Sequence, residues 1–369
     1  MVRFGLNLMA SNNKTVAALI GAGFMGSVHS RALRAAGIEI AGVLSSSSSA
    51  SERAAKDLGI DKAYRSLDEL LEDSKANLVH ILTPNSTHGD LVSKALEAGK
   101  HVVCEKPLTP DSKQAVELSA RAKQLGLVGA VPFVYRYHAM AREAKHRVAS
   151  GQLGKIFGVR GSYLQDWLLD PEDFNWRVDA ESGGPSRAFA DIGIHLCDLV
   201  EFVTGQRITR LVSTLLTAFP VRANRAVSTE DSAGVLAHLE GGAVVSLLVS
   251  QVAAGHKNAL VLEVHGSSEA MSFEQENPEQ LWVGKSTQSL LLMRDPNSLS
   301  AAAKRISSLP SGHPEGYLDA FISFVEDVDF AIQGDRSLDL PGFDDGARSA
   351  QLTEAVLKSA ESGTWVNVS

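Results

Sequence analysis

The feature that most constrains the fold is a glycine-rich turn between an apolar strand pattern and a helical pattern. Residues 16–20 run directly into Gly21-Ala22-Gly23-Phe24-Met25-Gly26, and apolar residues at helical spacing follow. In G-x-G-x-x-G the first glycine permits a tight turn, the second lets a pyrophosphate approach the backbone, and the third lets the helix pack on the strand. The helix N-terminus adds free N–H groups and partial positive charge. The segment predicts a dinucleotide site formed by Gly21, Gly23, Phe24, Met25 and Gly26.

Further strand patterns alternate with helical patterns as far as residue 130. They lie at residues 38–44, 78–82, 101–104 and 127–130. Such alternation is typical of a doubly wound parallel sheet covered by helices. We therefore expect an α/β Rossmann domain over residues 15–132, preceded by an N-terminal extension over residues 1–14.

Beyond residue 132 the alternation stops. A helix is predicted near residues 138–150, and strands at 156–163, 207–217, 231–239, 243–252 and 258–266 include pairs joined by short polar turns. Consecutive strands with tight turns predict an antiparallel sheet. Helices over residues 191–203, 314–333 and 343–362 complete an expected α+β domain over residues 133–369.

The composition limits the classes of binding partner more than it limits the classes of fold. The 369 residues suit two domains, and a net charge of -8 without a basic block argues against nucleic acid or an anionic membrane as partner. No run reaches the roughly 18 apolar residues of a membrane span. Only Cys104 and Cys197 are present, so we expect a reducing, cytoplasmic compartment. The histidines form no spaced ligand set, so no metal site is predicted. The charge instead favours a small molecule as the substrate.

The end of the second strand bears on the choice between NAD and NADP. The acidic residue that usually binds the ribose hydroxyls should stand there, but the chain has Leu44-Ser45-Ser46-Ser47. Without that carboxylate a 2′-phosphate is not repelled, yet no arginine adjoins the serines to bind one. We expect NAD, with NADP as the alternative, and the adenosine ribose near Ser45 and Ser46.

Two segments carry candidate catalytic groups. Glu105-Lys106-Pro107 follows a strand, which puts Lys106 at the carboxyl edge of the parallel sheet, where such folds bind ligands. Asp191 and His195 are four residues apart and share a helix face, with Asp198 on a similar bearing. A carboxylate beside an imidazole fixes its tautomer and raises its basicity, which suits proton removal from a hydroxyl. The competing interpretation is a surface lysine, a capping aspartate and a core histidine.

Together these residues resemble the glucose-fructose oxidoreductase and inositol dehydrogenase family (Gfo/Idh/MocA) over nearly the whole chain from Thr15. The matching marks are the glycine-rich turn, Thr83-Pro84-Asn85 with His88, Glu105-Lys106-Pro107, Gly151-Gln152-Leu153-Gly154, and Asp191 with His195 and Asp198. The resemblance implies a Rossmann domain followed by a domain with a large, open, mostly antiparallel sheet. Such sheets often make oligomer contacts, so a homo-oligomer, dimer or tetramer, is expected.

The resemblance also implies residue roles. Lys106, Asp191 and His195 are the expected catalytic group, and a cis bond before Pro107 is expected. The cofactor is expected to contact Thr83, Pro84, Asn85, His88, Glu105 and Lys106 in addition to the glycine-rich turn.

The segment from Tyr163 to Trp167, with Asn175-Trp176-Arg177, looks like family members that act on sugars and anhydrosugars such as levoglucosan. Aromatic faces and hydrogen-bonding side chains suit a carbohydrate. The expected substrate contacts are Lys106, Tyr163, Gln165, Trp167, Arg177, Asp191 and His195. The alternative, that Trp167 and Trp176 pack the domain junction, stays open.

The predicted activity is hydride transfer between nicotinamide and a hydroxyl carbon of a sugar, anhydrosugar or cyclitol. His195 would take the hydroxyl proton, Lys106 would stabilise the oxygen, and Asp191 would orient the site. A redox-neutral glycosidase that oxidises its substrate transiently is the first alternative. A non-catalytic cofactor-binding regulator is the second, since fold alone does not establish function, but retention of all three catalytic candidates argues against it.

Overall fold

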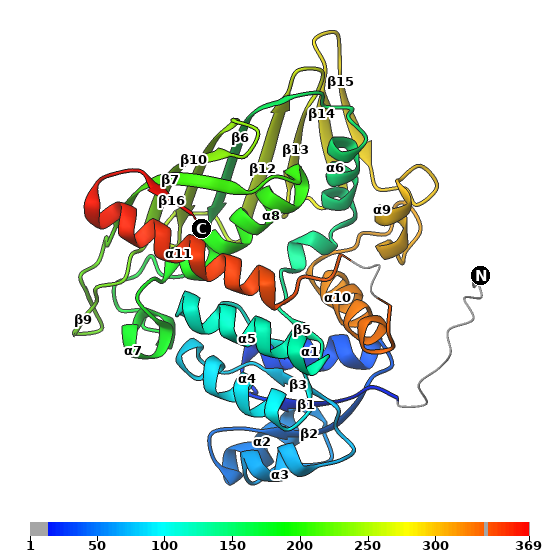
Figure 1. Ribbon diagram of the computed structural model, residues 1–369, viewed down its shortest axis with the longest axis vertical. Coiled ribbons are helices and arrows are strands. Elements are labelled where there is room, and N and C mark those ends of the chain that lie inside the picture. Colours follow the sequence, from blue (N-terminus) through cyan, green and yellow to red (C-terminus); the bar gives the residue numbers. More distant parts are fainter. Residues whose placement is uncertain (1–13, 336–338, 369) are drawn as a thin grey trace.

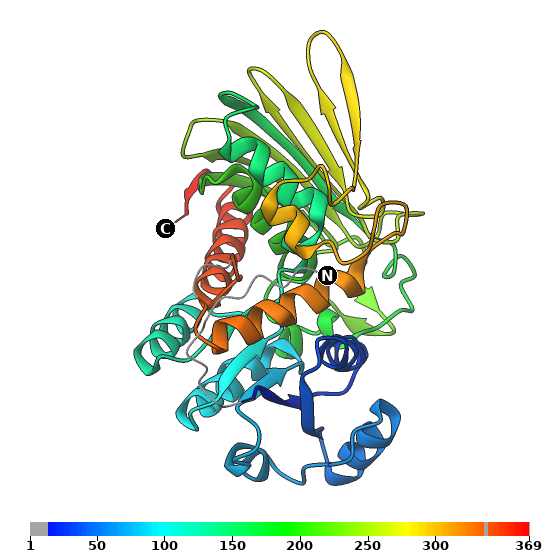
Figure 2. The same cartoon turned by 90° about the vertical axis from the view of Figure 1, so that its right-hand side faces the viewer.

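The computed structural model describes residues 14–335 and 339–368, so the predicted extension over residues 1–14 lies outside the described residues apart from Lys14. Figures 1 and 2 show a parallel sheet with its helices at one end of the molecule and a larger sheet at the other. No helix of the described ranges has the length and apolar character needed to cross a membrane.

The N-terminal sheet is parallel throughout. Its strand order is β2-β1-β3-β4-β5, which is a doubly wound arrangement. The strands are β1 (Val16–Ile20), β2 (Glu39–Leu44), β3 (Leu78–Ile81), β4 (His101–Cys104) and β5 (Gly129–Ala130), and the helices are α1 (Phe24–Ala35), α2 (Ser48–Leu58), α3 (Leu67–Glu72), α4 (His88–Glu97) and α5 (Ser112–Leu125). This confirms the predicted Rossmann fold.

The continuous apolar sequence of β1 reflects burial on both faces of the sheet. Ala18 and Ile20 pack with the apolar residues of α4 and α5. Ala17 and Leu19 face the opposite way, toward α1 and toward α10 (Tyr317–Ile332), which packs Phe321, Phe324, Val325 and Val328 into the same cluster. A helix from the C-terminal half of the chain therefore covers part of the N-terminal sheet. Residues beyond 132 thus contribute to the core of the Rossmann part as well as to the second part of the molecule.

The second sheet is large and mostly antiparallel, as expected. Its strand order is β15-β14-β13-β12-β6-β11-β10-β7-β16, and within it only β6 and β11 pair in parallel in the part of the chain that the structure describes. The strands are β6 (Ile156–Leu164), β7 (Ile208–Leu216), β10 (Ser232–Leu239), β11 (Val244–Ser250), β12 (Ala259–Gly266), β13 (Ala270–Glu274), β14 (Gln280–Gly284), β15 (Ser289–Met293) and β16 (Val366–Asn367); β8 (Val221–Arg222) and β9 (Arg225–Ala226) form a separate hairpin.

One face of this sheet is covered by helices. These are α6 (Ala139–Ala149), α8 (Ile194–Thr204) and α11 (Phe343–Ser362) (Figures 1 and 2). Helix α9 (Ala301–Ile306) packs on α6, and α7 (Ala180–Gly183) packs against residues 85–87 of the Rossmann part. The strands alternate buried and exposed residues, so the other face is open. The structure adds β13, β14, β15 and β16 to the strands that the sequence predicted.

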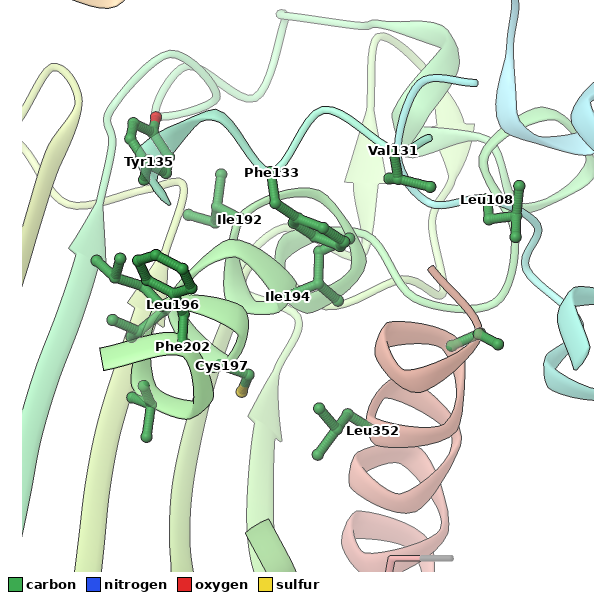
Figure 3. Packing of buried hydrophobic residues seen from close by; sticks show 14 of the residues in the cluster. Leu108, Val131, Phe133, Tyr135, Ile192, Ile194, Leu196, Cys197, Phe202 and Leu352 are labelled. Carbon is green, nitrogen blue, oxygen red and sulfur yellow. The ribbon is translucent and has the colours of Figure 1, made fainter. Parts of the chain in front are cut away.

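The two parts of the molecule meet around the segment after β5. Figure 3 shows Phe133 of this segment beside Ile192, in the turn before α8, and Ile194, the first residue of α8, with Leu352 of α11 nearby. The buried cluster runs without interruption from the Rossmann sheet to the large sheet. The junction is therefore a packed core that fixes one sheet relative to the other.

Candidate active site

The glycine-rich turn joins β1 to α1 with little room behind it. Gly21 has a φ of 102°, and a Cβ there would lie 2.6 Å from the carbonyl oxygen of Leu82, so only glycine suits this turn. A Cβ at Gly26 would lie 3.0 Å from the Gly21 carbonyl oxygen. A Cβ at Gly23 would meet nothing within 4 Å. The backbone at Gly23 is therefore open to a ligand on the side where α1 begins.

A cavity of about 800 Å³ adjoins this turn at the carboxyl edge of the parallel sheet. It is lined by every residue predicted to bind the cofactor except Gly26, which lies behind the turn: Gly21, Gly23, Phe24, Met25, Ser45, Ser46, Thr83, Pro84, Asn85, His88, Glu105 and Lys106. Trp176 and Arg177 line it too, with the guanidinium of Arg177 4.4 Å from the centre of the Trp176 ring. The size, the open backbone at Gly23 and the position fit an extended dinucleotide.

Two of these residues also hold the surrounding loops in place. The ring of His88 is fully buried, and its nitrogens each lie 2.8 Å from a backbone carbonyl oxygen, Nδ1 from that of Pro107 and Nε2 from that of Thr83. Asn85 donates to the carbonyl oxygen of Gly183 at 2.8 Å. His88 therefore braces the loop that presents Lys106, and the Lys106-Pro107 bond in that loop is cis, as expected.

A second cavity of about 490 Å³ continues from the first. The two share Phe24, Met25, Glu105, Lys106 and Arg177 at their common edge. The second cavity brings together all the residues predicted to contact substrate: Lys106, Tyr163, Gln165, Trp167, Arg177, Asp191 and His195.

Lys106 is held by Asp191. Lys106 Nζ lies 2.5 Å from Asp191 Oδ1 and also donates to the Asp191 backbone carbonyl oxygen at 2.9 Å. Gln251 Nε2 donates to the other carboxylate oxygen at 2.7 Å, and Arg177 Nε lies 3.5 Å from Oδ1. Although burial raises the pKa of Asp191, the charges of Lys106 and Arg177 outweigh it and hold the pKa well below its usual range. Asp191 is thus an ionised anchor for the ammonium group.

His195 lies beside this pair on α8 and is 8% exposed. Its ring packs edge-on against Tyr135 at 5.1 Å between ring centres. Burial, followed by the positive charge of Lys106, lowers the pKa of His195 to about 3. The expectation that a neighbouring carboxylate raises the basicity of His195 is therefore wrong in its net effect, because Glu105 and Asp191 raise this pKa by less than burial and Lys106 lower it. The imidazole is neutral at physiological pH and able to accept a proton.

Asp198 does not share the bearing of His195. It lies outside the residues that line the second cavity, and its carboxylate is bound by Arg136, whose Nε donates to Oδ2 at 2.8 Å. Arg136 also donates to Asp345 at 2.8 Å. The offset of about 60° between residues three apart on a helix still lets the two side chains meet different neighbours, and the contact with Arg136 gives Asp198 a structural role.

A hydrogen-bonded wall of the second cavity is formed by residues other than the Lys106–Asp191 pair. Tyr163 donates to Asn258 Oδ1 at 2.6 Å, and Gln165 donates to the same oxygen at 2.8 Å. The Trp167 indole N–H donates to Gln165 at 2.9 Å. Trp167 is half-buried and lines this cavity, whereas Trp176 lines the first. The wall therefore presents aromatic and amide groups whose orientation is set before any ligand arrives.

Four residues of the site were not predicted from the sequence: Gln251 and Asn258, which orient predicted site residues, and Tyr135 and Tyr317, which line the second cavity. They lie far along the chain from the motifs and carry no local signature. No group of three or more His, Cys, Asp or Glu side chains suited to a metal ion occurs within residues 14–335 and 339–368.

Comparison with known proteins agrees with this geometry. Residues 16–133 match the family model of an oxidoreductase family with an NAD-binding Rossmann fold, and residues 141–272 match the GFO/IDH/MocA C-terminal domain. The levoglucosan dehydrogenase of Pseudarthrobacter phenanthrenivorans is 27% identical, over 95% of this chain and 97% of that protein.

Solved structures extend the likeness to the whole fold. An oxidoreductase domain protein from Kribbella flavida is 32% identical with a TM-score of 0.88, over 97% of this chain and all of that one. A levoglucosan dehydrogenase in complex with NADH and levoglucosan is 27% identical with a TM-score of 0.90, over 96% of this chain and 99% of that one. Fold and site together define an NAD-binding oxidoreductase that acts on hydroxyl carbons. The chain belongs to the Gfo/Idh/MocA family.

Replacing Gly23 with valine is expected to weaken dinucleotide binding by about 10- to 100-fold, the range that corresponds to one lost charge-assisted hydrogen bond. The added side chain would meet no protein atom within 4 Å of its Cβ and would extend into the first cavity, so binding should fall without loss of stability. Titration calorimetry of Gly23→Ala and Gly23→Val should show a graded loss, and thermal unfolding serves as the control. Unchanged affinity for both NAD and NADP in Gly23→Val would show that the pyrophosphate does not bind at this turn.

Proposed function

We propose that this enzyme transfers a hydride between nicotinamide and a hydroxyl carbon of an uncharged sugar, anhydrosugar or cyclitol, with Lys106, Asp191 and His195 as its catalytic group. The observation that carries the proposal is the shared edge of the two cavities. Lys106 lies on that edge, and Asp191 and His195 adjoin it on the side of the second cavity.

Each catalytic residue has a distinct task. A bound nicotinamide supplies the hydride acceptor or donor. The neutral imidazole of His195 accepts the hydroxyl proton during oxidation and returns it during reduction. The Lys106 ammonium hydrogen-bonds the same oxygen and stabilises negative charge on it, and Asp191 keeps the ammonium in place at 2.5 Å. Gln251 is a positioning residue, because it holds the second oxygen of Asp191.

The second cavity favours an uncharged polyol. Its positive groups, Lys106 and Arg177, are both within 4 Å of the Asp191 carboxylate, and Glu105 adds a further negative charge at the shared edge. The remaining polar lining consists of amides, hydroxyls and an indole, which pair with sugar hydroxyls. Similarity to the levoglucosan dehydrogenase supports this substrate class.

The function is tested by screening neutral sugars, anhydrosugars, inositols and glycosides with NAD and with NADP. Reduced cofactor is followed by absorbance, and products by chromatography. Net NADH formation with a free polyol supports the dehydrogenase. Cleavage of a glycoside without net NADH would instead indicate the redox-neutral glycosidase, and tight cofactor binding without turnover of any substrate would indicate a regulator.

Introducing aspartate at Ser45 is expected to sharpen the preference for NAD over NADP about tenfold, or about 1.4 kcal/mol. Ser45 lines the first cavity at the end of β2, where a carboxylate would bond the ribose hydroxyls and repel a 2′-phosphate. The ratio of the two dissociation constants is the measurement. Ser45→Asn, which has the same shape without the charge, is the matched control. Improved NADP use by Ser45→Asp would mean that the ribose lies elsewhere.

We also propose that the open face of the large sheet contacts a second copy of this chain. Leu236 of β10, Val244 and Leu248 of β11 and Leu291 of β15 are exposed. Exposed apolar side chains on several strands of one sheet are typical of a protein interface. Light scattering should find a dimer or tetramer, and a monomeric mass at micromolar concentration would contradict the proposal.

A further inference from the structure

Three buried side chains lie in a row behind the edge that the two cavities share. Glu105 Oε1 is 3.0 Å from His29 Nε2, and His29 Nδ1 is 2.8 Å from His80 Nδ1. Both histidines are wholly buried and Glu105 is 7% exposed. His29 belongs to α1, three residues beyond Gly26, and His80 belongs to β3. The row therefore joins the helix that follows the phosphate turn to the centre of the sheet, and it ends at the candidate active site.

The direction of the hydrogen bonds follows from the acceptor at the end of the row. An ionised Glu105 only accepts, so His29 Nε2 donates to it. When His29 carries a single ring proton, its Nδ1 accepts from His80 Nδ1, which leaves His80 Nε2 as a lone pair. That nitrogen is buried and has no hydrogen-bond partner among the described residues. The opposite direction would place an unpaired N–H there together with an imidazolium at His29, which is the more costly arrangement.

The charge states agree with this direction. Burial, and to a smaller extent His29, holds the pKa of His80 well below its usual range, so His80 is neutral. Burial alone would raise the pKa of Glu105, but the contact with His29, followed by the charge of Lys106, brings it below its usual value. The second oxygen of Glu105 accepts from the backbone N–H of Lys106 at 3.3 Å. Both oxygens of an ionised carboxylate are thus held.

Glu105 has a different position from Asp191, although both are acidic residues of the site. The Lys106 ammonium is paired with Asp191 at 2.5 Å, whereas the side chain of Glu105 is bound by His29. Glu105 lines both cavities, and Asp191 lines only the second. A fixed negative charge is therefore presented where a dinucleotide that spans the first cavity would end.

We propose that His29, backed by His80, is a positioning residue that holds the Glu105 carboxylate against the nicotinamide end of the cofactor and so favours its oxidised form. The inference rests on the proposed function, because it requires a nicotinamide at the shared edge. The oxidised ring carries a positive charge that the reduced ring lacks. A carboxylate in surroundings of low dielectric attracts the charged ring and leaves the neutral one almost unaffected.

The test measures dissociation constants for NAD⁺ and NADH separately, by calorimetry, without substrate. Glu105→Gln removes the charge and should weaken NAD⁺ about tenfold, about 1.4 kcal/mol, while NADH changes less than about twofold. His29→Leu should shift the same ratio in the same direction, because the carboxylate loses its donor. His29→Gln, which retains an amide donor, should restore most of the preference, and His80→Leu should shift the ratio about threefold.

Ser30→Ala is the matched control, since Ser30 is buried on the same helix and donates only to the Ser27 carbonyl oxygen. It should leave both constants unchanged. Equal weakening of NAD⁺ and NADH in His29→Leu, or an unchanged ratio in Glu105→Gln, would overturn the inference and leave the row a structural feature. If His29→Leu does not fold, the ratio in His80→Leu decides. A wild-type protein that binds neither form would refute the proposed function instead.

Discussion

Replacing either Lys106 or His195 with alanine is expected to lower turnover by about 10²- to 10⁴-fold, the usual contribution of a general acid–base group. In the proposed mechanism both groups act on the reacting oxygen, so dinucleotide affinity and the fold should be largely retained. Because they serve the same step, the double variant should be little worse than the poorer single variant. Steady-state kinetics combined with cofactor titration measures all three effects.

Lys100 provides the matched control for Lys106. It is also a buried lysine, but its Nζ donates to the backbone carbonyl oxygens of Asp73 and Ala76 at 2.9 and 2.7 Å, away from both cavities. Lys100→Ala should lower stability and keep turnover. Near wild-type turnover in both Lys106→Ala and His195→Ala would refute the catalytic assignment and favour a surface lysine and a core histidine.

Lowering the pH from 7.5 to 4 is expected to cost the native state about 3 kcal/mol through His195 alone. The pKa of this residue is about 3 in the folded protein, and an unfolded histidine has a pKa near 6.5. Below pH 6.5 His195 therefore binds a proton in the unfolded chain that it does not bind in the folded chain. The contribution is fully present above pH 6.5 and is lost as the pH falls toward 3.

Denaturant unfolding at several pH values, in wild type and His195→Leu, isolates this contribution. The variant should lose about 3 kcal/mol less than wild type over the same interval. His146, which is exposed on α6, is the control, and His146→Leu should show the wild-type pH dependence. The same low pKa predicts that kcat/KM keeps its value down to about pH 5. An acid limb centred near pH 6.5 that belongs to His195 would contradict the neutral, buried imidazole.

The parts of this protein that the sequence predicted well are those with local determinants. The glycine-rich turn depends mainly on Gly21, which has a φ of 102°. The helix at 343–362 has its own apolar periodicity and ends before Gly363. The motifs that place Lys106, Asp191 and His195 are also short. Their meeting in one cavity was predicted through the family resemblance, since eighty-five residues separate Lys106 from Asp191.

The features that sequence reasoning missed depend on contacts between distant segments. Asn258 and Gln251 bind site residues only because β12 and the end of β11 lie beside β6 and the π-helical turn at Phe189–Gly193. Strands β13 to β15 were not predicted either, because each is short. Asp198 was wrongly predicted to point toward the site because helix periodicity gives the direction of a side chain but not the residue that it binds. That residue, Arg136, lies 62 residues earlier.

Helix α10 also bears on how the protein reaches its native state during synthesis. Phe321, Phe324 and Val328 complete one face of the parallel sheet, and they are made about three hundred residues after β1. Until α10 has left the ribosome, Leu19 and Leu33 lack the part of their packing that α10 supplies. A fragment that stops at residue 132 is therefore expected to leave this apolar face partly uncovered. The parallel sheet gains its full cover only late in translation.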